Sequence, residues 1–574
     1  MERAVACLLL TDSESVRLHR RRAAAGRAPA SPMDLEHAIG FDSKASNSLH
    51  VHPDGSSVIY VLGGCVVISQ LKDAHNQVFL RGHNDQVTCV DLTKDGSLLA
   101  SGQDGEQADV IVWEYTEGVD GGLPQCTEKY RLQEHDVGIA FCYFTHCGRF
   151  LLTVGKDKKL VVWDMHSGCI VARYKVSNMP LSACWGGRAL DTKGRLTATF
   201  QLATGGEGKL TYWILDPAAG SLTPEDCSLG NQVRNFTALA FSPDATYLFA
   251  GSSSSDFTAV HVKHKVLHST TVVGSNGVHV LICRRTDNGD RLIIGCGDGS
   301  ITVLEGERNG ADTCRMYSKG PPLQCSLMLD GPVRAMQLHG DVDESGFMRV
   351  LAVSGHGTLY ACEMSAVDYR ASQAPPAKSR VLQESHYAPV MAVAYPADSS
   401  ETFATVSCDG TIRVWDVNTY GVNATGRIQT RICGMPKCLD FTGDVVFTGW
   451  EDGQIRAHEA ETGEMLWAIK DAHRDGCTAL AVSHNHKFLV SGGELGEVRV
   501  WEIRTREMVV NMKQHTSTVT SIKLFPDDAY VYSSSRDRTI LQWDLRAVRM
   551  PHTRAHTHKH THVHTRAHSR THAH

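Results

Sequence analysis

The segment Asp409-Gly410-Thr411-Ile412-Arg413-Val414-Trp415-Asp416 begins with a tight-turn dipeptide, continues as an alternating strand, and ends in tryptophan and an acid. Apolar residues at every second position are typical of a β-strand with one face in a core. Three further segments share this pattern: Lys158–Asp164, Gly496–Glu502 and Arg538–Asp544. Such recurrence indicates an internal repeat, and the repeat unit then determines the fold.

The repeat unit extends well upstream of its tryptophan. Histidines precede several of these segments, at His83, His135, His386, His473 and His515. Between histidine and tryptophan lie apolar strands separated by turns such as Pro526-Asp527-Asp528. The unit is therefore four short strands in about 40–50 residues, which predicts one small antiparallel sheet per repeat and an all-β fold.

Eleven units can be aligned on the position of the tryptophan. The aligned positions are Ile68, Trp113, Trp163, Trp213, Val262, Leu304, Cys362, Trp415, His458, Trp501 and Trp543. Five of the eleven units lack the tryptophan, and together the units cover roughly residues 45–546.

The repeat resembles the WD-repeat β-propeller family, in which each repeat forms one blade. The resemblance implies a buried chain in which an aspartate accepts from a histidine ring, the histidine meets a serine or threonine hydroxyl, and the hydroxyl meets the indole N–H. Since each donor finds an acceptor, such a chain can be buried between blades. Three repeats carry every member: His135, Thr153, Asp157 and Trp163; His386, Thr405, Asp409 and Trp415; His515, Ser533, Asp537 and Trp543.

The same residue types also occur in hydrolase triads, but a triad needs an exposed nucleophile and an oxyanion hole. Here the trio recurs in several repeats, always beside tryptophan, which favours the structural role. The stretch Gly205-Gly206-Glu207-Gly208-Lys209 lacks the serine or threonine of a phosphate-binding loop. The sequence therefore predicts no catalytic residue, no cofactor, no metal site and no small-molecule substrate.

Eleven blades exceed one ring, because propellers close with typically four to eight. An Ala/Ser/Pro-rich run without alternation follows the seventh repeat and is interpreted as a linker. The predicted divisions are a disordered leader (1–34), a seven-bladed propeller (35–364), the linker (365–380), an incomplete second propeller of four blades (381–548) and a low-complexity tail (549–574). Four insertions are candidate contact loops: Thr116–Cys126, Gly186–Thr199, Gly306–Gln324 and Ser365–Arg380.

Charge and composition exclude some classes of partner. The net charge is −6, yet residues 1–32 and 551–574 are both basic, so the chain between them is more acidic than the whole. An acidic body without a long basic run argues against nucleic acid. No run of about 18 apolar residues exists, which argues against a membrane span. The 18 cysteines, for example Cys89, Cys142 and Cys438, are interpreted as core residues in a reducing cytosol.

The order of unusual blades resembles the axonemal members of the WD-repeat family. The relevant stretches are Asp34–Phe41, the insertion ending at Trp113, Trp450–Ala457 and Ser491–Trp501. The resemblance implies two seven-bladed propellers and a non-catalytic scaffold in the axoneme of cilia and flagella, which are cytoplasmic, cytoskeletal structures. It further implies contact with tubulin and other microtubule inner proteins. The alternative is a cytosolic WD-repeat adaptor, such as a ubiquitin-ligase substrate receptor or a signalling scaffold.

The tail alternates histidine and threonine and holds nine of the 30 histidines. Alternating imidazoles on an extended strand can bind Zn, Ni or Cu, but selective sites need fixed geometry and supporting contacts. A CA dinucleotide repeat read in frame also encodes alternating histidine and threonine. We favour this second interpretation, so residues 549–574 are expected not to be native structure.

Overall fold

The computed structural model describes most of the chain between residues 35 and 547. The described ranges are 35–42, 47–73, 75–118, 124–190, 195–286, 289–308, 314–317, 327–340, 347–365, 377–396, 399–429 and 434–547. The chain divides into two compact units, Met1–Ala38 and Ile39–His574, and every strand given below belongs to the second. The predicted leader (1–34) and the histidine-rich tail (549–574) lie outside the described residues.

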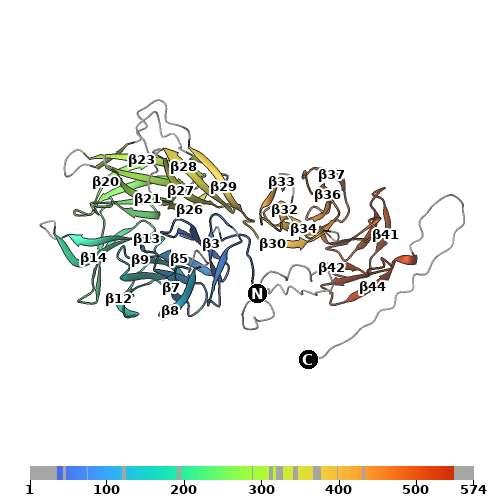
Figure 1. Ribbon diagram of the computed structural model, residues 1–574, viewed down its shortest axis with the longest axis horizontal. Helices are drawn as coiled ribbons and strands as arrows, with labels where there is room; N and C mark the ends of the chain where they lie inside the picture. Colours follow the sequence, from blue (N-terminus) through green and yellow to red (C-terminus); the bar gives the residue numbers. More distant parts are fainter. Residues whose placement is uncertain are drawn as a thin grey trace. The chain divides into compact units, whose positions relative to one another are not determined.

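The described residues form eleven antiparallel sheets, numbered here in chain order (Figure 1). Sheet 1 contains β1 (Leu49–Val51), β2 (Ser57–Leu62), β3 (Cys65–Gln70) and β4 (Gln77–Arg81). Sheet 2 contains β5 (Val87–Leu92), β6 (Leu98–Gln103), β7 (Asp109–Thr116) and β8 (Gln125–Gln133). Sheet 3 contains β9 (Ile139–Phe144), β10 (Phe150–Gly155), β11 (Lys159–Asp164) and β12 (Cys169–Lys175). Sheet 4 contains β13 (Ser182–Leu190), β14 (Leu196–Gly205), β15 (Leu210–Asp216) and β16 (Ser221–Asp226).

The next three sheets repeat the order. Sheet 5 contains β17 (Phe236–Phe241), β18 (Tyr247–Ser252), β19 (Asp256–His261) and β20 (Val266–Val272). Sheet 6 contains β21 (Val278–Thr286), β22 (Gly289–Cys296), β23 (Ser300–Arg308), β24 (Cys314–Tyr317) and a short β25 (Leu327–Met328) that pairs with β23. Sheet 7 contains β26 (Val333–Leu338), β27 (Phe347–Ser354), β28 (Thr358–Ser365) and β29 (Lys378–Glu384).

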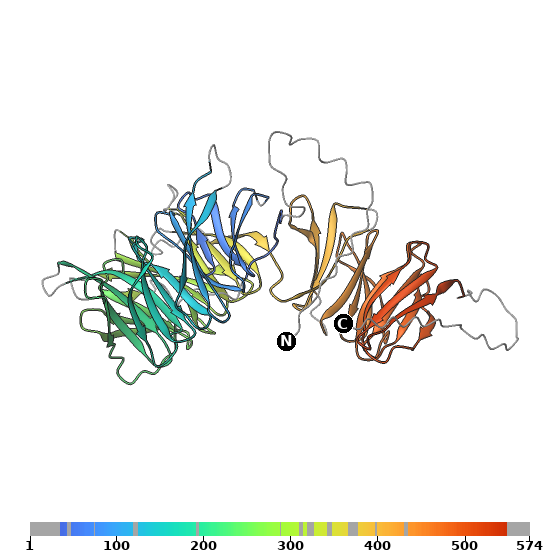
Figure 2. The same ribbon diagram turned by 90° about the horizontal axis from the view of Figure 1, so that it is seen from below.

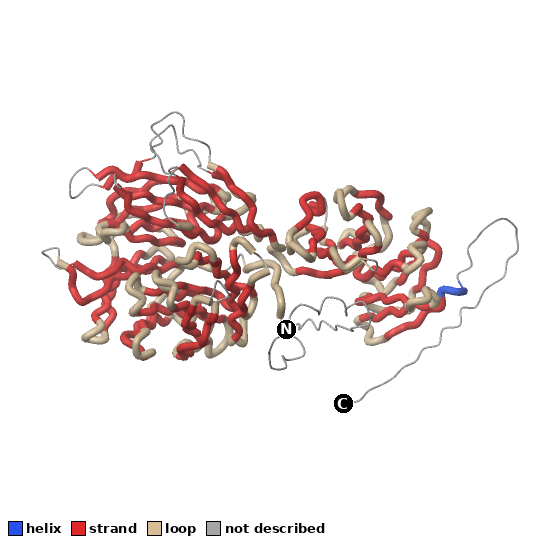
Figure 3. The backbone as a smooth tube through the Cα atoms, viewed as in Figure 1, coloured by secondary structure: helices blue, strands red, loops and turns tan. Residues whose placement is uncertain are grey.

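Four sheets follow. Sheet 8 contains β30 (Val390–Ala394), β31 (Thr402–Ser407), β32 (Thr411–Asp416) and β33 (Val422–Gln429). Sheet 9 contains β34 (Pro436–Thr442), β35 (Val445–Trp450), β36 (Ile455–Glu459) and β37 (Met465–Ile469). Sheet 10 contains β38 (Cys477–Val482), β39 (Phe488–Gly493), β40 (Val498–Glu502) and β41 (Met508–Met512). Sheet 11 contains β42 (Val519–Leu524), β43 (Tyr530–Ser535) and β44 (Ile540–Asp544), followed by a 3-10 turn, η3 (Leu545–Ala547). Figure 3 shows how strongly strand dominates.

Neighbouring sheets pack face to face, so a sheet that has a neighbour on each side is apolar on both faces. In β10 all six residues are buried, so its sequence does not alternate between apolar and polar residues, and Thr153 is its one polar side chain. The rings of Phe150 in sheet 3 and Phe200 in sheet 4 meet edge to face, 5.1 Å apart. Cys89, Cys142 and Cys438 are buried in these cores, as expected.

The first strands of sheets 1 to 7 are neighbours in chain order, and β26 of sheet 7 also contacts β1 of sheet 1 (Figures 1 and 2). An apolar cluster joins these two sheets, with Leu49 from sheet 1 and Leu359 from sheet 7 among its members. The Nε2 atom of His339 lies 2.8 Å from the carbonyl oxygen of Gly55, 284 residues earlier. Sheet 7 therefore packs against sheet 1.

The structure differs from the sequence prediction at one domain boundary and at one tryptophan slot. β29 pairs with β28, so the predicted linker (365–380) ends inside a strand of sheet 7, and the predicted boundary at 380/381 divides that strand. Val262 follows β19, whereas Val260 pairs with Leu248 as Trp163 pairs with Leu151. Val260 therefore occupies the tryptophan position of sheet 5.

All four predicted contact loops include residues of paired strands, and two of them include more than the strand ends. Gly186–Thr199 includes the parts of β13 and β14 that adjoin their hairpin turn, and Gly306–Gln324 includes the pairing of β23 with β24. These two insertions therefore lengthen their sheets. Within the described ranges, no helix has the length and apolarity needed to cross a membrane.

Candidate functional site

The twelve predicted site residues lie in three sets. In each set the hydroxyl and the tryptophan lie on strands of one sheet, and the histidine and the aspartate lie in loops next to these strands. In sheet 3 the indole Nε1 of Trp163 donates to the Thr153 hydroxyl at 3.0 Å, which lies 2.9 Å from Nε2 of His135. The histidine Nδ1 lies 3.1 Å from Oδ1 of Asp157. Because a carboxylate only accepts, Nδ1 carries a proton, and Nε2 of the neutral ring accepts from the hydroxyl.

The sets of sheets 8 and 11 have the same connectivity. In sheet 8 the three distances, from indole to carboxylate, are 2.8, 2.7 and 2.7 Å for Trp415, Thr405, His386 and Asp409. In sheet 11 they are 2.8, 2.8 and 3.0 Å for Trp543, Ser533, His515 and Asp537. Each set is thus a continuous chain of hydrogen bonds across one sheet.

The aspartate of each set also holds the turn between the second and third strands. Asp409 accepts from the backbone N–H of Thr411 at 2.9 Å and from its hydroxyl at 2.6 Å. Burial by itself raises the pKa of this carboxyl, but the bonds from His386 and Thr411 outweigh it, and the pKa falls to about 2. Asp409 is therefore ionised in the folded protein at neutral pH.

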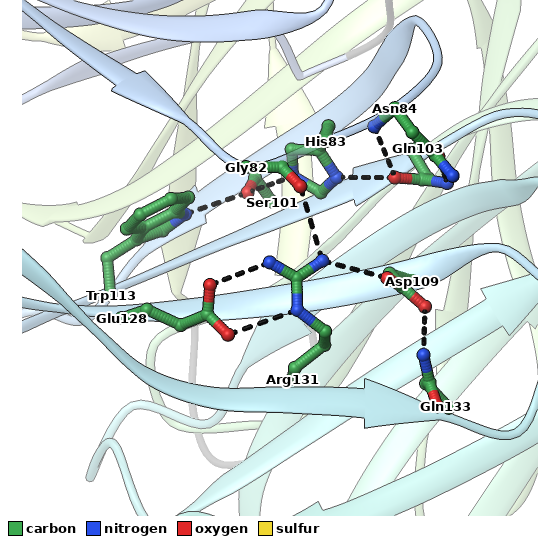
Figure 4. Close-up of polar contacts among 10 residues, drawn as sticks. All are labelled: Gly82, His83, Asn84, Ser101, Gln103, Asp109, Trp113, Glu128, Arg131 and Gln133. Atoms are coloured by element: carbon green, nitrogen blue, oxygen red, sulfur yellow. Dashed lines mark hydrogen bonds and ion pairs between the residues drawn. The ribbon is translucent and has the colours of Figure 1, made fainter.

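Sheet 2 builds the chain with a different acceptor (Figure 4). Trp113 donates to Ser101 at 2.9 Å, and Ser101 lies 2.7 Å from His83. The insertion before β7 displaces the usual turn, and Oε1 of Gln103 meets Nδ1 of His83 at 2.9 Å. The amide of Gln103 in turn donates to Asn84. A neutral amide can replace the carboxylate because it also offers an acceptor oxygen.

Arg131 on the last strand of sheet 2 forms a second network beside this chain (Figure 4). Its guanidinium donates to Asp109 at 2.8 Å, to Glu128 at 2.7 and 3.1 Å, and to the carbonyl of Gly82 at 3.2 Å. Gln133 donates to the other oxygen of Asp109 at 2.9 Å. The planar fork of arginine satisfies three acceptors at once, which fixes the strands around the insertion.

Among the described residues, sheet 10 has no hydrogen-bond acceptor for Nδ1 of its histidine. Trp501 donates to Ser491 at 2.8 Å, and Ser491 lies 2.7 Å from Nε2 of His473. Leu495 stands where the other sheets place aspartate, so Nδ1 of His473 is buried without a hydrogen bond, 3.7 Å from Glu497. Burial, with the charge of Arg499, lowers the pKa of His473 to about 3.

Sheets 9 and 4 keep only the tryptophan and its acceptor. In sheet 9 the tryptophan slot holds His458, whose pKa falls to about 4 through burial and the charge of Arg456. Trp450, on the preceding strand, supplies the indole instead and donates to Thr448 at 2.8 Å. In sheet 4 Trp213 donates to Thr204 at 2.8 Å. Sequence reasoning missed Trp450 because it lies outside the aligned slot.

The first strands of sheets 2 to 7 line a cavity of about 820 Å³. Asp91 lies on its wall, where its carboxylate accepts from the backbone N–H of Phe144 in the next sheet at 2.6 Å. Burial raises the pKa of Asp91 to about 7. In sheet 9 Asp440 makes the equivalent bond to Val482 of sheet 10 at 2.7 Å, and burial raises its pKa too. These carboxyls join neighbouring sheets.

Nothing in the described ranges assembles three histidine, cysteine, aspartate or glutamate side chains that could hold a metal ion. The described polar contacts thus comprise networks within single sheets and, at Asp91 and Asp440, bonds between neighbouring sheets.

The family model for the WD domain, G-beta repeat matches five segments: 75–114, 126–164, 378–416, 466–502 and 506–544. Each match ends one residue after the tryptophan of sheets 2, 3, 8, 10 or 11. These are the sheets in which histidine, hydroxyl and tryptophan are linked. The chain therefore contains WD40 repeats in these five segments.

Relatives extend over nearly the whole chain. Cilia- and flagella-associated protein 52 from Bos taurus is 28% identical over 534 residues, which cover 91% of this chain and 78% of the relative. The protein of the same name from Chlamydomonas reinhardtii is 28% identical over 530 residues, with the same two coverages. WD repeat-containing protein 90 from Mus musculus is 25% identical over 507 residues, covering 82% of this chain and 24% of the relative.

Replacement of Leu495 by aspartate should complete the chain of sheet 10. The new carboxylate gives Nδ1 of His473 an acceptor, so the variant should gain about 1 kcal/mol in free energy of unfolding. The pKa of His473 should rise towards that of an ordinary histidine. Denaturant unfolding and NMR titration of the imidazole would measure both. The matched control, Asp537→Leu in sheet 11, should lose at least as much stability. An unchanged His473 pKa would contradict the assignment of position 495.

Asp409 should make stability depend on pH between about 4 and 2. Its folded pKa lies below the ordinary value of 3.8, so its contribution is present above pH 4 and is lost as pH falls towards 2. The contribution should be about 2 kcal/mol. The measurement compares the unfolding free energies of the wild type and Asp409→Asn from pH 5 to pH 2. The other carboxyls titrate in both proteins, so parallel curves would refute the role of Asp409.

Proposed function

We propose that this protein is a non-catalytic structural scaffold of motile cilia and flagella, located in the axoneme. One observation carries the proposal: the relationship to cilia- and flagella-associated protein 52 covers 91% of the chain, and thus both the first seven and the last four sheets. A match confined to single WD repeats would support only the fold.

The use of the polar residues supports a scaffold. In every His–Ser/Thr pair described above, the hydroxyl accepts a hydrogen bond from an indole inside its own sheet. A catalytic nucleophile would instead have to be exposed to substrate. The groups that resemble catalytic residues stabilise sheets instead. A protein of this kind acts through its surfaces and loops.

The proposed architecture has two parts. Sheets 1 to 7 form a closed seven-bladed propeller, because sheet 7 packs against sheet 1 through the cluster that contains Leu49 and Leu359. Sheets 8 to 11 are four blades of a second propeller. The division between them follows β29, which belongs to sheet 7.

The proposed partners are tubulin and neighbouring microtubule inner proteins of the doublet. Long-range attraction is a weak driving force here, because this chain carries a net negative charge and tubulin is also acidic. Docking would therefore depend on shape and on local polar contacts at loops between strands. The described ends of the 116–126 insertion, next to β7 and β8, are one such surface.

Fractionation of axonemes tests the proposed location. The protein should remain with doublet microtubules through detergent extraction and high-salt washing, because a protein inside the lattice is protected from both. Immunoblotting of each fraction, with tubulin as the retained marker, provides the measurement. Release into the detergent-soluble fraction would contradict the scaffold and favour the cytosolic adaptor.

Limited proteolysis tests the proposed architecture. At high dilution a non-specific protease should leave a resistant fragment close to residues 35–384 and should degrade the rest, because an open array lacks the last sheet-to-sheet contact. Mass spectrometry of the digest identifies the fragment. Equal resistance of both parts at high dilution would contradict the division into a closed and an open group.

A further inference from the structure

Sheet 4 keeps the hydroxyl and the indole of the polar chain but has no histidine. Trp213 donates to Thr204 at 2.8 Å, and the exposed fractions of these two residues are 2% and 5%. None of residues 176–181, which lead into β13, is a histidine. Ser177 lies two residues after the end of β12, as His135 lies two residues after the end of β8. A serine therefore stands where sheet 3 has its imidazole ring.

The hydroxyl of Thr204 lacks the partner that the other hydroxyls have. A neutral imidazole nitrogen accepts the proton of Thr153 in sheet 3, and the hydroxyls of sheets 2, 8, 10 and 11 have the same partner. Among the described residues, none accepts a hydrogen bond from the Thr204 hydroxyl. A buried donor without an acceptor costs free energy. Sheet 4 thus holds an unused donor where sheet 3 holds a ring.

A glycine that lies against the ring in other sheets is also present in sheet 4. The ring of His135 lies so close to Gly155 that a Cβ atom on this glycine would overlap Nδ1, and His473 lies against Gly493 in the same way. Both glycines are the second residue after the hydroxyl of their sheet, and Gly206 has this position in sheet 4. Glycine at this position leaves the space that an imidazole ring fills.

This space is part of a pocket at sheet 4, with a volume of about 430 Å³. Apart from its chain neighbours, the atom nearest to a Cβ on Gly206 would be the carbonyl oxygen of Met179, at 3.6 Å. Ser177, Thr204 and Trp213 all line the pocket. The volume is within the range of small-ligand sites and is larger than one imidazole ring needs. The kinds of group that surround the ring in sheet 3 thus surround a pocket here.

The rim of the pocket is aromatic and charged. Tyr174 is 37% exposed, and its ring lies edge to face with that of Trp213, with 4.9 Å between the centroids. Nζ of Lys209 lies 3.1 Å from a carboxylate oxygen of Asp226, and the exposed Glu207 also lines the pocket. A peptide whose side chain enters the pocket finds donors and acceptors for its main chain at this rim.

We propose that this pocket receives the imidazole ring of a histidine from a partner protein, which completes the polar chain of sheet 4. Nε2 of the neutral ring accepts from the Thr204 hydroxyl, and the ring packs against Gly206 as the internal histidines of sheets 3 and 10 pack against their glycines. The rest of the partner segment lies along the rim that contains Glu207 and Lys209. The proposal goes beyond the scaffold role and does not depend on the ciliary location.

Imidazole is the first probe, added to the full chain with isotope-labelled tryptophan and followed by NMR. The variant Trp213→Phe identifies the indole resonance of Trp213 among those of the nine tryptophans. At about pH 8, where the ring is neutral, imidazole should shift this resonance saturably in the millimolar range, because the hydroxyl that accepts from the indole gains a partner. Pyrrole has the ring N–H but no acceptor nitrogen, so it should bind at least about tenfold more weakly.

Two variants close the pocket without removing the hydroxyl. Ser177→His supplies an internal ring and Gly206→Leu fills the space, so each should weaken imidazole binding at least about tenfold. The other indole resonances report whether each variant is folded. Thr204→Ser should bind like the wild type, since Ser533 has the same role in sheet 11. The matched control Gly421→Leu lies outside the pocket and should leave binding unchanged.

Blocked tripeptides test the source of the ring. Glycyl-histidyl-glycine with blocked ends should shift the same resonance and compete with imidazole, whereas its phenylalanine analogue should do neither. A Trp213 resonance that does not respond to imidazole overturns the proposal, as does imidazole binding that persists in Ser177→His and Gly206→Leu. Binding of imidazole without binding of the histidine peptide restricts the pocket to free small molecules and overturns the partner. The doublet fractionation remains a separate test of the proposed function in each case.

Discussion

The structure depends on one constraint: every sheet is apolar on both faces and needs a neighbour on each side. A four-stranded sheet such as sheet 3, with β10 completely buried, has no face suited to water. Stacked sheets bury each other's apolar faces. In a group of sheets every face is buried only if the last sheet packs against the first. The cluster that joins Leu49 and Leu359 meets this condition for sheets 1 to 7. Sheets 8 and 11 each keep one apolar face exposed.

In seven of the eleven described sheets, a hydroxyl on the second strand accepts from an indole and is the centre of the polar contacts. The bond between this hydroxyl and an indole occurs in sheets 2, 3, 4, 8, 10 and 11, and sheet 9 makes it with a tryptophan from another strand. The partner of the histidine varies: a carboxylate in three sheets, an amide in sheet 2, and none in sheet 10. A buried indole N–H without an acceptor is costly, whereas one histidine nitrogen can lose its partner if the ring stays neutral. The low pKa of His473 fits this explanation.

Much of this organisation could be predicted from the sequence, because alternation and a recurrent tryptophan report the strand period and the repeat period directly. The eleven aligned units correspond to eleven sheets, and the three four-residue sets lie within hydrogen-bond distance. The assignment of β29 to sheet 7 could not be predicted, because a run without alternation separates it from the other strands of that sheet. The roles of Gln103 and Trp450 could not be predicted from the sequence. Gln103 replaces the aspartate and Trp450 replaces the tryptophan from positions outside the aligned ones, and only their contacts in the structure show this. The exposure of Val393 in sheet 8 and Ile540 in sheet 11 could not be predicted, since the equivalent residues Leu480 and Ile412 are also apolar but are buried.

The contact between sheets 1 and 7 also has a consequence during synthesis. The contact between Gly55 and His339 cannot form until the 284 residues that follow Gly55 have been made. At about 5–20 residues per second the ribosome needs roughly 15 to 60 s for that stretch. For this time the growing chain has paired sheets but an uncovered face on sheet 1, next to the ribosome and to other nascent chains. A contact between distant residues also slows folding itself, because the chain entropy is lost before the contact forms. Leu49 and Tyr60 therefore lack their partners from sheet 7 until that sheet has been made.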